Sequence, residues 1–132
     1  MFNKVFGGAY PVGSIIKPLI GSAALQEKVI GTNTSVEDKG ALEIPNRYDP
    51  NIKYTFRSYE RHSAIGVVNV TRAIAMSSNV FFYTVGGGYA NIGGLGVNRL
   101  TSYYSKFGIG KKTGVDIPEE TAGTLPTPEL KK

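Results

Sequence analysis

The chain has 132 residues, of which 41% are apolar and 19% charged, and its formal net charge at pH 7 is +5. This composition fits one small globular domain and excludes a disordered or fibrous chain. There is no cysteine and only one histidine, His62, so disulfides and thiolate metal sites are excluded, and a Ser–His–Asp triad or a histidine-based metal site is disfavoured. We therefore expect neither a metal nor a cofactor, and we assign His62 no role.

Basic residues are scattered along the chain, and only Lys111-Lys112 and Lys131-Lys132 adjoin. Scattered Lys and Arg side chains usually form a solvated surface, so we expect no nucleic-acid partner. No apolar run approaches the roughly 20 residues that a membrane-spanning helix needs. The first four residues do not resemble a signal peptide, and we expect any export signal or membrane anchor to lie outside this chain.

The first predicted element is a buried helix. Residues 10–13 (YPVG) are typical of a turn, and Ser14 directly after them can cap a helix. From Ile15 to Val29 apolar side chains fall on most helical faces, which is the pattern of a buried helix. We therefore predict a centrally buried helix from Ser14 to about Glu27, with Pro18 in its first turn, where little hydrogen bonding is lost.

The middle of the chain, residues 32–61, is polar and irregular, and Pro45 and Pro50 interrupt it. Two short runs within it, residues 41–44 and 52–56, are compatible with the strands of a small hairpin. No other strand is predicted.

The second half of the chain is predicted to be helical until about residue 106. One helix is expected to begin near Asn69, an apolar run at residues 80–83 leads to three glycines, and a further helix is expected from Val97 to about Lys106. From Gly108 onward the chain resembles a loop, with three prolines. The pattern predicts a mainly α unit with a short β-hairpin.

Two short polar motifs stand out against the apolar background. Ser14 and Lys17 are three positions apart, which on a helix places both side chains on one face, one turn apart. A serine nucleophile needs this geometry if a lysine amine takes its proton, although a capping serine and a solvated lysine have the same spacing. Ser77-Ser78-Asn79 is either a plain turn between helices or a second part of the site, in which Ser77 relays a proton and Asn79 holds a substrate amide and the lysine.

Lys17 faces an energetic demand if it acts as a base near neutral pH. Lowering a lysine pKa from about 10.4 to about 7 requires roughly 4–5 kcal/mol of destabilisation of the ammonium form. Burial among Ile15, Ile16 and Leu19 supplies part of this, and a second nearby cation would supply more.

The context and order of these motifs resemble the class B penicillin-binding proteins. Residues 10–18 (YPVGSIIKP) resemble the active-site serine segment, and residues 73–83 (AIAMSSNVFFY) resemble the second motif with its apolar flank. Residues 107–118 (FGIGKKTGVDIP) and 123–129 (GTLPTPE) resemble later segments of the elongation-type enzymes, which act in cell-wall synthesis and cell shape. The similarity covers nearly the whole chain in the expected order.

This resemblance implies that residues 1–132 are a partial transpeptidase domain, the helical subdomain of an α+β penicillin-binding fold whose central sheet is largely missing. It implies that Ser14 attacks the D-Ala-D-Ala carbonyl of a peptidoglycan stem peptide while Lys17 takes its proton. Ser77 and Asn79 would shuttle protons and orient the substrate, and the Ser14 N–H would form half of an oxyanion hole. β-Lactams would acylate the same serine. The parent protein would be anchored in a bacterial inner membrane with this domain outside the cytoplasm.

Lys112-Thr113-Gly114 has the composition of the third motif of the family, but we interpret it as a structural loop. Gly110, Gly114 and Pro118 surround it, and these residues disfavour a strand. The chain would then lack a carboxylate-binding lysine, one oxyanion N–H and the second cation near Lys17. Because the loss of one oxyanion donor costs about 10²–10³ in rate, we expect the isolated chain to be slow or inactive. We also expect its sheet-facing helices to expose apolar surface, at residues 80–85, on the Ser14 helix and at the glycine-lined segment around Gly108, and the chain to self-associate through it.

Two alternatives remain open from the sequence. A β-lactam-sensing receptor domain shares the serine and the lysine but signals instead of turning over, and residues 107–118 favour the synthase over it. The other alternative is a non-catalytic structural module, which the ordered motifs disfavour.

Overall fold

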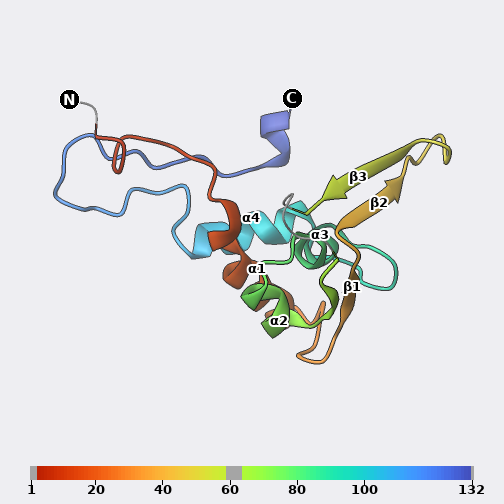
Figure 1. Cartoon of the computed structure of the whole chain (residues 1–132). Coiled ribbons are helices and arrows are strands. Elements are labelled where there is room, and N and C mark those ends of the chain that lie inside the picture. Colours follow the sequence, from red (N-terminus) through yellow and green to blue (C-terminus); the bar gives the residue numbers. More distant parts are fainter. Residues whose placement is uncertain (1–2, 59–63, 132) are drawn as a thin grey trace.

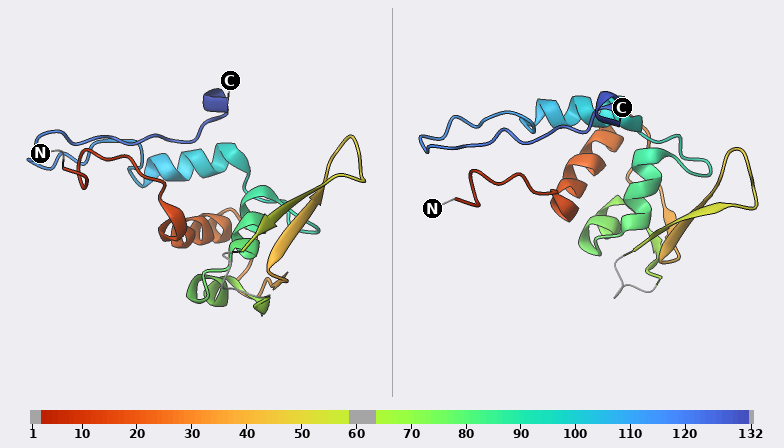
Figure 2. Two further views of the ribbon diagram at one scale, coloured as in Figure 1. Left: turned by 45° about the horizontal axis from the view of Figure 1, so that its top comes forward. Right: turned by 90° about the horizontal axis from the view of Figure 1, so that it is seen from above.

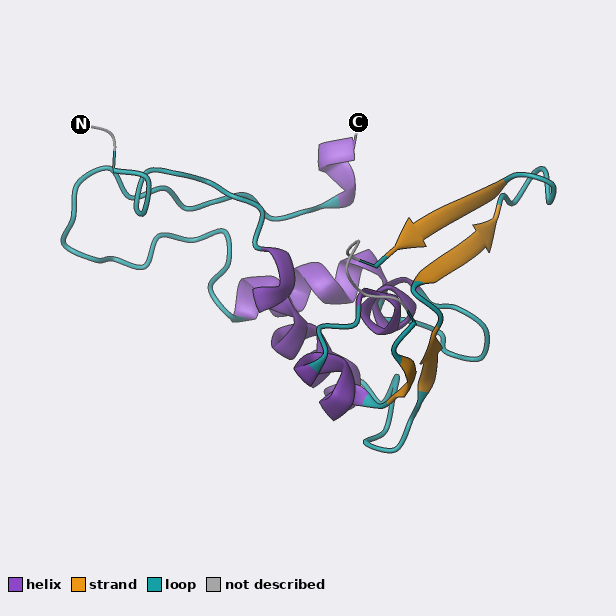
Figure 3. Ribbon diagram, viewed as in Figure 1, coloured by secondary structure: helices purple, strands orange, loops and turns teal. Residues whose placement is uncertain are grey.

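The computed structural model describes residues 3–58 and 64–131, and His62 lies outside these ranges. Within them, four α-helices pack together and two small antiparallel sheets lie beside them (Figure 1, Figure 3). The helices are α1 (Lys17–Gln26), α2 (Val70–Ala75), α3 (Asn79–Gly87) and α4 (Gly96–Lys106). The strands are β1 (Val36–Asp38), β2 (Ala41–Pro45), β3 (Lys53–Arg57) and β4 (Gly66–Val68). Two 3-10 turns are η1 (Gly13–Ile16) and η2 (Pro128–Lys131).

The helices α1 and α3 form the centre of the molecule. Ala23 and Ala24 on α1 are fully buried against the apolar side of α3, where Phe81 and Val85 are also fully buried. Small alanine side chains on α1 let the two helices approach closely. The predicted apolar run at residues 80–83 therefore belongs to a core helix, with only Tyr83 among its side chains exposed.

The central position expected for the first helix is confirmed, but the expectation that it is buried on most faces is wrong. Ile15, in the 3-10 turn before α1, is 81% exposed, and Leu19 and Leu25 are half-buried. The apolar residues of this segment lie on two surfaces. One packs on α3, and the other faces outward beside Ser14.

The hairpin is confirmed, and a second strand pair accompanies it. Strands β2 and β3 pair antiparallel with Ala41 opposite Arg57 and Pro45 opposite Lys53. Strands β1 and β4, which were not predicted, lie on either side of this hairpin in sequence and pair with Asp38 opposite Gly66. Each has three residues, too few to show an alternating pattern in the sequence, and their pairing depends on the chain closing around the hairpin.

The expected end of α3 at the triple glycine has a steric cause. Gly88 has φ of 87°, which is a left-handed conformation that favours glycine. Gly94 also has positive φ, and a Cβ on it would lie 2.3 Å from the backbone nitrogen of Gly88. The loop between α3 and α4 can therefore fold back against the end of α3 only with glycine at these positions.

The segment after α4 is a loop, as predicted, and it runs beside the N-terminal segment away from the helices (Figure 1, Figure 2). A backbone hydrogen bond of 2.8 Å from Thr121 N–H to the Phe6 carbonyl joins the two segments. None of the helices within residues 3–58 and 64–131 has the length and apolar character required to cross a membrane.

Candidate active site

Ser14 lies where η1 leads into α1. Gly13 before it has φ of +59°, a conformation that glycine adopts without strain, and this turns the chain into the helix. The expectation that Ser14 caps the helix is wrong. The N-cap residues are Val12 for η1 and Ile16 for α1, and neither makes a side-chain capping hydrogen bond. The Ser14 side chain is exposed, and its Oγ instead accepts a hydrogen bond of 3.0 Å from Ser77 Oγ.

Lys17, at the start of α1, is buried, with 7% of its surface exposed. Its Nζ donates to the carbonyl oxygen of Ser77 at 2.7 Å, to Ser77 Oγ at 2.9 Å and to Asn79 Oδ1 at 2.6 Å. Nζ also lies 5.8 Å from the centroid of the Phe82 ring, within the range of a cation–π contact. The separation of Asn79 and Lys17 is therefore well inside the 5 Å expected from the sequence.

The three residues Ser77-Ser78-Asn79 form the turn between α2 and α3, with Asn79 as the first residue of α3. Ser77 has φ of 54°, a left-handed conformation that is uncommon for residues other than glycine. This conformation lets the carbonyl and the hydroxyl of one residue face the same amine. Strained residues of this kind gather at functional sites, where the surroundings hold them in place.

A continuous chain of polar atoms joins the lysine to the exposed serine. It runs from Lys17 Nζ through Ser77 Oγ to Ser14 Oγ, with steps of 2.9 and 3.0 Å. Among the described residues, no direct hydrogen bond joins Ser14 and Lys17. The geometry therefore favours a route through Ser77 over direct transfer between the two residues of the first motif.

Burial lowers the pKa of the Lys17 amine from its usual value, because an ammonium group loses solvation in the core. The carboxylate of Asp38 acts in the opposite direction and raises the pKa, with the smaller effect. The direction agrees with what a lysine base needs. Its main cause is burial, as expected, although Ile15, one of the three residues expected to supply that burial, is 81% exposed.

Asp38 and Ser78 form a buried hydrogen-bonded pair next to the residues that contact Lys17, and the sequence did not indicate this pair. Asp38, at the end of β1, is fully buried, and its Oδ2 accepts from Ser78 Oγ at 2.5 Å. Ser78 Oγ in turn accepts from Phe81 N–H at 3.1 Å and so caps α3. In the sequence, Asp38-Lys39-Gly40 is typical of a turn, and a turn does not reveal which side chain the aspartate contacts.

The prediction that Lys112-Thr113-Gly114 is a loop is confirmed. Thr113 donates from its N–H and from its hydroxyl to one carboxylate oxygen of Glu120, each at 2.6 Å. These bonds lower the pKa of the Glu120 carboxyl. These bonds hold Thr113 within its own loop, outside any strand of the described residues.

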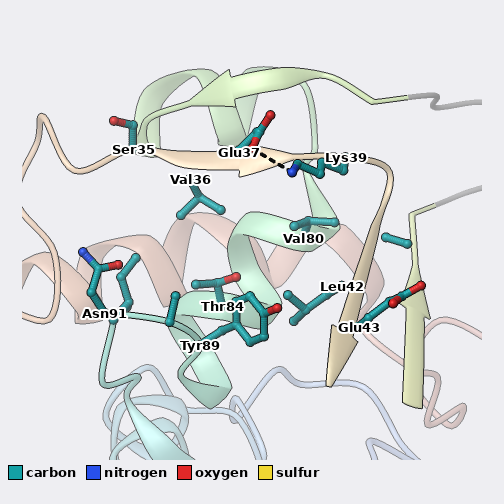
Figure 4. A pocket seen from close by; sticks show the side chains of 13 residues that line it. Ser35, Val36, Glu37, Lys39, Leu42, Glu43, Val80, Thr84, Tyr89 and Asn91 are labelled. Carbon is teal, nitrogen blue, oxygen red and sulfur yellow. Dashed lines mark ion pairs between the residues drawn. The ribbon is translucent and has the colours of Figure 1, made fainter. Parts of the chain in front are cut away.

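A separate pocket of about 510 Å³ lies between β1, β2, α3 and the loop after α3 (Figure 4). Glu37 and Lys39 form an ion pair of 3.1 Å at its edge, and the Thr84 hydroxyl in its wall has no hydrogen-bond partner among the described residues. None of Ser14, Lys17, Ser77 or Asn79 lines it. Within the described ranges, no group of three or more His, Cys, Asp or Glu side chains could hold a metal ion.

Comparison with known proteins relates this geometry to one family. The model of the penicillin binding protein transpeptidase domain matches residues 1–132. The peptidoglycan D,D-transpeptidase MrdA of Acinetobacter baumannii is 33% identical over 131 residues, which are 99% of this chain and 18% of that protein.

Two solved structures have similar folds. The penicillin-binding protein PBP2 of Pseudomonas aeruginosa, in complex with WCK 5153, matches with a TM-score of 0.82 and 32% identity over 98% of this chain and 27% of that one. PBP2 of Helicobacter pylori, in complex with MreC, matches with a TM-score of 0.80 and 28% identity over 98% of this chain and 22% of that one. The chain spans 18% of the length of the curated relatives first matched.

Proposed function

The chain belongs to the penicillin-binding protein transpeptidase domain family, and we propose that it is the serine-bearing part of a peptidoglycan D,D-transpeptidase. Ser14 is the residue that is acylated, both by a stem peptide ending in D-Ala-D-Ala and by β-lactams. The observation that carries this proposal is the chain from Lys17 Nζ through Ser77 Oγ to Ser14 Oγ. The matched relatives are transpeptidases, which favours a synthase over a β-lactam sensor.

The first step of the proposed reaction transfers one proton along that chain. With Lys17 uncharged, its Nζ can accept from the Ser77 hydroxyl, and Ser77 Oγ can accept from the Ser14 hydroxyl, so both bonds run opposite to the directions described for the ammonium form. Ser14 Oγ then bonds to the substrate carbonyl carbon and gives its proton to Ser77 Oγ, and Ser77 gives its own proton to the neutral amine of Lys17. Lys17 must start uncharged, and the burial that lowers its pKa favours that form. Asn79 Oδ1 holds Nζ in line, and the Ser14 N–H is half of the oxyanion hole.

The second step resolves the acyl-enzyme. The C–N bond to the terminal D-alanine breaks, and its amine takes the proton held on Lys17. The amine of a neighbouring stem peptide then attacks the ester carbonyl to form the cross-link. The bond to Ser14 Oγ breaks, and one proton of the attacking amine returns to Ser14 Oγ through Lys17 and Ser77. We further infer that the intact protein is anchored in the inner membrane with this domain outside the cytoplasm. Residues 1–132 alone lack the third motif, so we expect them to acylate slowly or not at all.

A chimeric protein tests this function. Residues 1–132 replace the matched segment of the Acinetobacter MrdA relative, and the purified chimera is incubated with a fluorescent penicillin. We expect labelling that peptide mapping assigns to Ser14 and that Ser14→Ala abolishes. Ser22→Ala is the matched control, because Ser22 is an exposed serine on α1 whose hydroxyl donates to the Pro18 carbonyl, and we expect it to leave labelling unchanged. A label on another serine, or one that persists in Ser14→Ala, would contradict the proposal.

A further inference from the structure

We propose that Asp38 is a positioning residue of the Ser14 site, which holds the Ser77–Asn79 turn through Ser78. Its negative charge also stabilises the ammonium form of the buried Lys17 side chain. The inference rests on the function proposed above. It assigns a role to a residue outside the serine, lysine and asparagine motifs.

The first part of the argument is the hydrogen-bond geometry around Asp38. Its Oδ2 accepts from Ser78 Oγ at 2.5 Å, and its Oδ1 accepts from Gly40 N–H at 2.8 Å. Each carboxylate oxygen thus has a partner, as a fully buried charge requires. Bonds to a charged acceptor are roughly twice as strong as neutral ones, so Asp38 fixes the Ser78 hydroxyl firmly.

Ser78 transmits this constraint to the catalytic turn. With its proton directed to Asp38, its Oγ lone pairs face the Phe81 N–H and cap α3. Ser78 is preceded by Ser77, whose left-handed backbone aims two oxygens at Lys17, and is followed by Asn79, which supplies the third. Fixing Ser78 therefore fixes both residues that contact the lysine amine.

The second part of the argument is charge. The ionisable side chains on the elements that pack against α1 are Arg72 on α2, Tyr83 on α3, and Arg99, Tyr103, Tyr104 and Lys106 on α4. None of these makes a hydrogen bond or an ion pair with Lys17 in the described part of the chain. Arg99 and Tyr103 instead contact Glu27, at 3.5 and 2.9 Å. Glu27 follows the other end of α1, about 15 Å along the helix from Lys17.

Three consecutive charged residues with different surroundings lie at the end of β1 and directly after it. Glu37 and Lys39 are exposed and pair with each other, and Asp38 between them is buried beside the Ser78 turn. Strand β4, the partner of β1, has no ionisable residue. Asp38 is accordingly the carboxylate whose charge acts on Lys17, and it raises the pKa that burial lowers.

The experiment measures Lys17 directly in the 132-residue chain and needs no acylation. Lysine labelled with ¹³C at Cε is titrated by NMR, and Lys17→Arg identifies the signal. In Asp38→Asn, which keeps the size of the side chain, we expect the Lys17 midpoint to move to lower pH. Glu37→Gln removes the same charge one residue away and is expected to leave the midpoint in place. An unmoved or raised midpoint in Asp38→Asn, or an equal change in Glu37→Gln, overturns the charge role.

Two further measurements decide the proposal even if Asp38→Asn does not fold. In the unmutated chain, the Asp38 ¹³Cγ signal should show a step at the Lys17 midpoint, and the Glu37 ¹³Cδ signal should not; no step at Asp38 overturns the charge role. Ser78→Ala should displace the Lys17 ¹³Cε signal, whereas Ser22→Ala, much nearer in sequence, should not. An undisplaced signal in Ser78→Ala overturns the positioning role. Because none of these readouts involves penicillin, failure of this inference is distinguishable from failure of the proposed function.

Discussion

Ser77 combines an unfavourable backbone with two contacts to the same lysine. A left-handed conformation costs a residue other than glycine roughly 1–2 kcal/mol, and the packing of α2 and α3 around the turn has to offset this cost. A glycine here would remove the cost but also the hydroxyl between Lys17 and Ser14. Serine at this position is explained if the contribution of its hydroxyl to the reaction outweighs the free-energy cost of the left-handed backbone.

Replacing Ser77 separates these two effects. Ser77→Ala and Ser77→Gly both remove the relay oxygen, so we expect each to slow acylation of Ser14 in the chimera by about 10²-fold or more, the usual range for a proton-transfer group. We expect Ser77→Gly to be the more stable of the two, by about 1 kcal/mol in urea denaturation, because glycine tolerates positive φ. Recovery of the acylation rate in Ser77→Gly alone would show that backbone strain, and not the hydroxyl, limits the reaction.

At the scale of elements, the sequence predicted the helices whose bounds are determined by local patterns. The helix expected at Val97–Lys106 is α4 (Gly96–Lys106), and the one expected from Asn69 is α2, with Asn69 as its cap. Ser14, Lys17, Ser77 and Asn79 were singled out because their motifs, in context and order, resemble those of a known family, whereas their spacing alone also fitted a capping serine and a plain turn. The structure places them together, and their roles remain predictions.

Asp38 could not be found in the same way, since its place depends on β1 pairing with β4 across an intervening hairpin. A short polar strand carries little pattern of its own, and its partner is set by the whole fold. The burial of α1 was overestimated for a related reason. Apolar residues such as Ile15 do not reveal whether they face the core of this chain or a surface that another part of a larger domain would cover.

Helix α2 offers a test of whether local capping stabilises the helix that leads into the Ser77–Asn79 turn. It has six residues, and Asn69 at its N-cap accepts from Arg72 N–H at 3.0 Å. We expect Asn69→Ala to lower the free energy of unfolding by about 1 kcal/mol and Asn69→Asp, which keeps the acceptor, to change it little. Asn98→Ala, on an exposed face of α4, should stay within about 0.5 kcal/mol. Urea denaturation checks all three, and equal effects of Asn69→Ala and Asn69→Asp would mean that the cap contributes nothing.

The surface area of the whole molecule is large for its length. A compact monomer of this size exposes about 6,800 Å², whereas this chain exposes 9393 Å². The projecting hairpin and the paired terminal segments contribute to the excess (Figure 2). The expectation that residues 80–85 supply an exposed apolar face is wrong, because most of them are buried in the core. The other two expected locations, the Ser14 helix and the segment around Gly108, do expose apolar side chains.

The apolar surface at these two locations is a hollow of about 480 Å³ between the start of α1 and the end of α4. Its lining is apolar apart from one serine: Val12, Ile15, Ile16, Pro18, Leu19, Ser22, Phe107 and Ile109. Ile15 is 81% exposed and Phe107 is 64% exposed. Contiguous apolar surface of this kind is uncommon on monomers and favours association. We name it the Ile15–Phe107 hollow.

We predict that the isolated chain self-associates through the Ile15–Phe107 hollow, because two copies facing each other there would cover apolar surface that each leaves in water. A specific contact between copies should bury more than about 1,000 Å² in total. Sedimentation velocity at about 100 µM should show a species larger than the monomer, and Phe107→Lys should shift the population toward the monomer by placing a charge in the contact. Tyr48→Lys makes the same kind of change at the hairpin, where Tyr48 is 91% exposed, and should have no effect. A clean monomer for the unmutated chain, or equal effects of the two lysine variants, would mean that the hollow does not drive association.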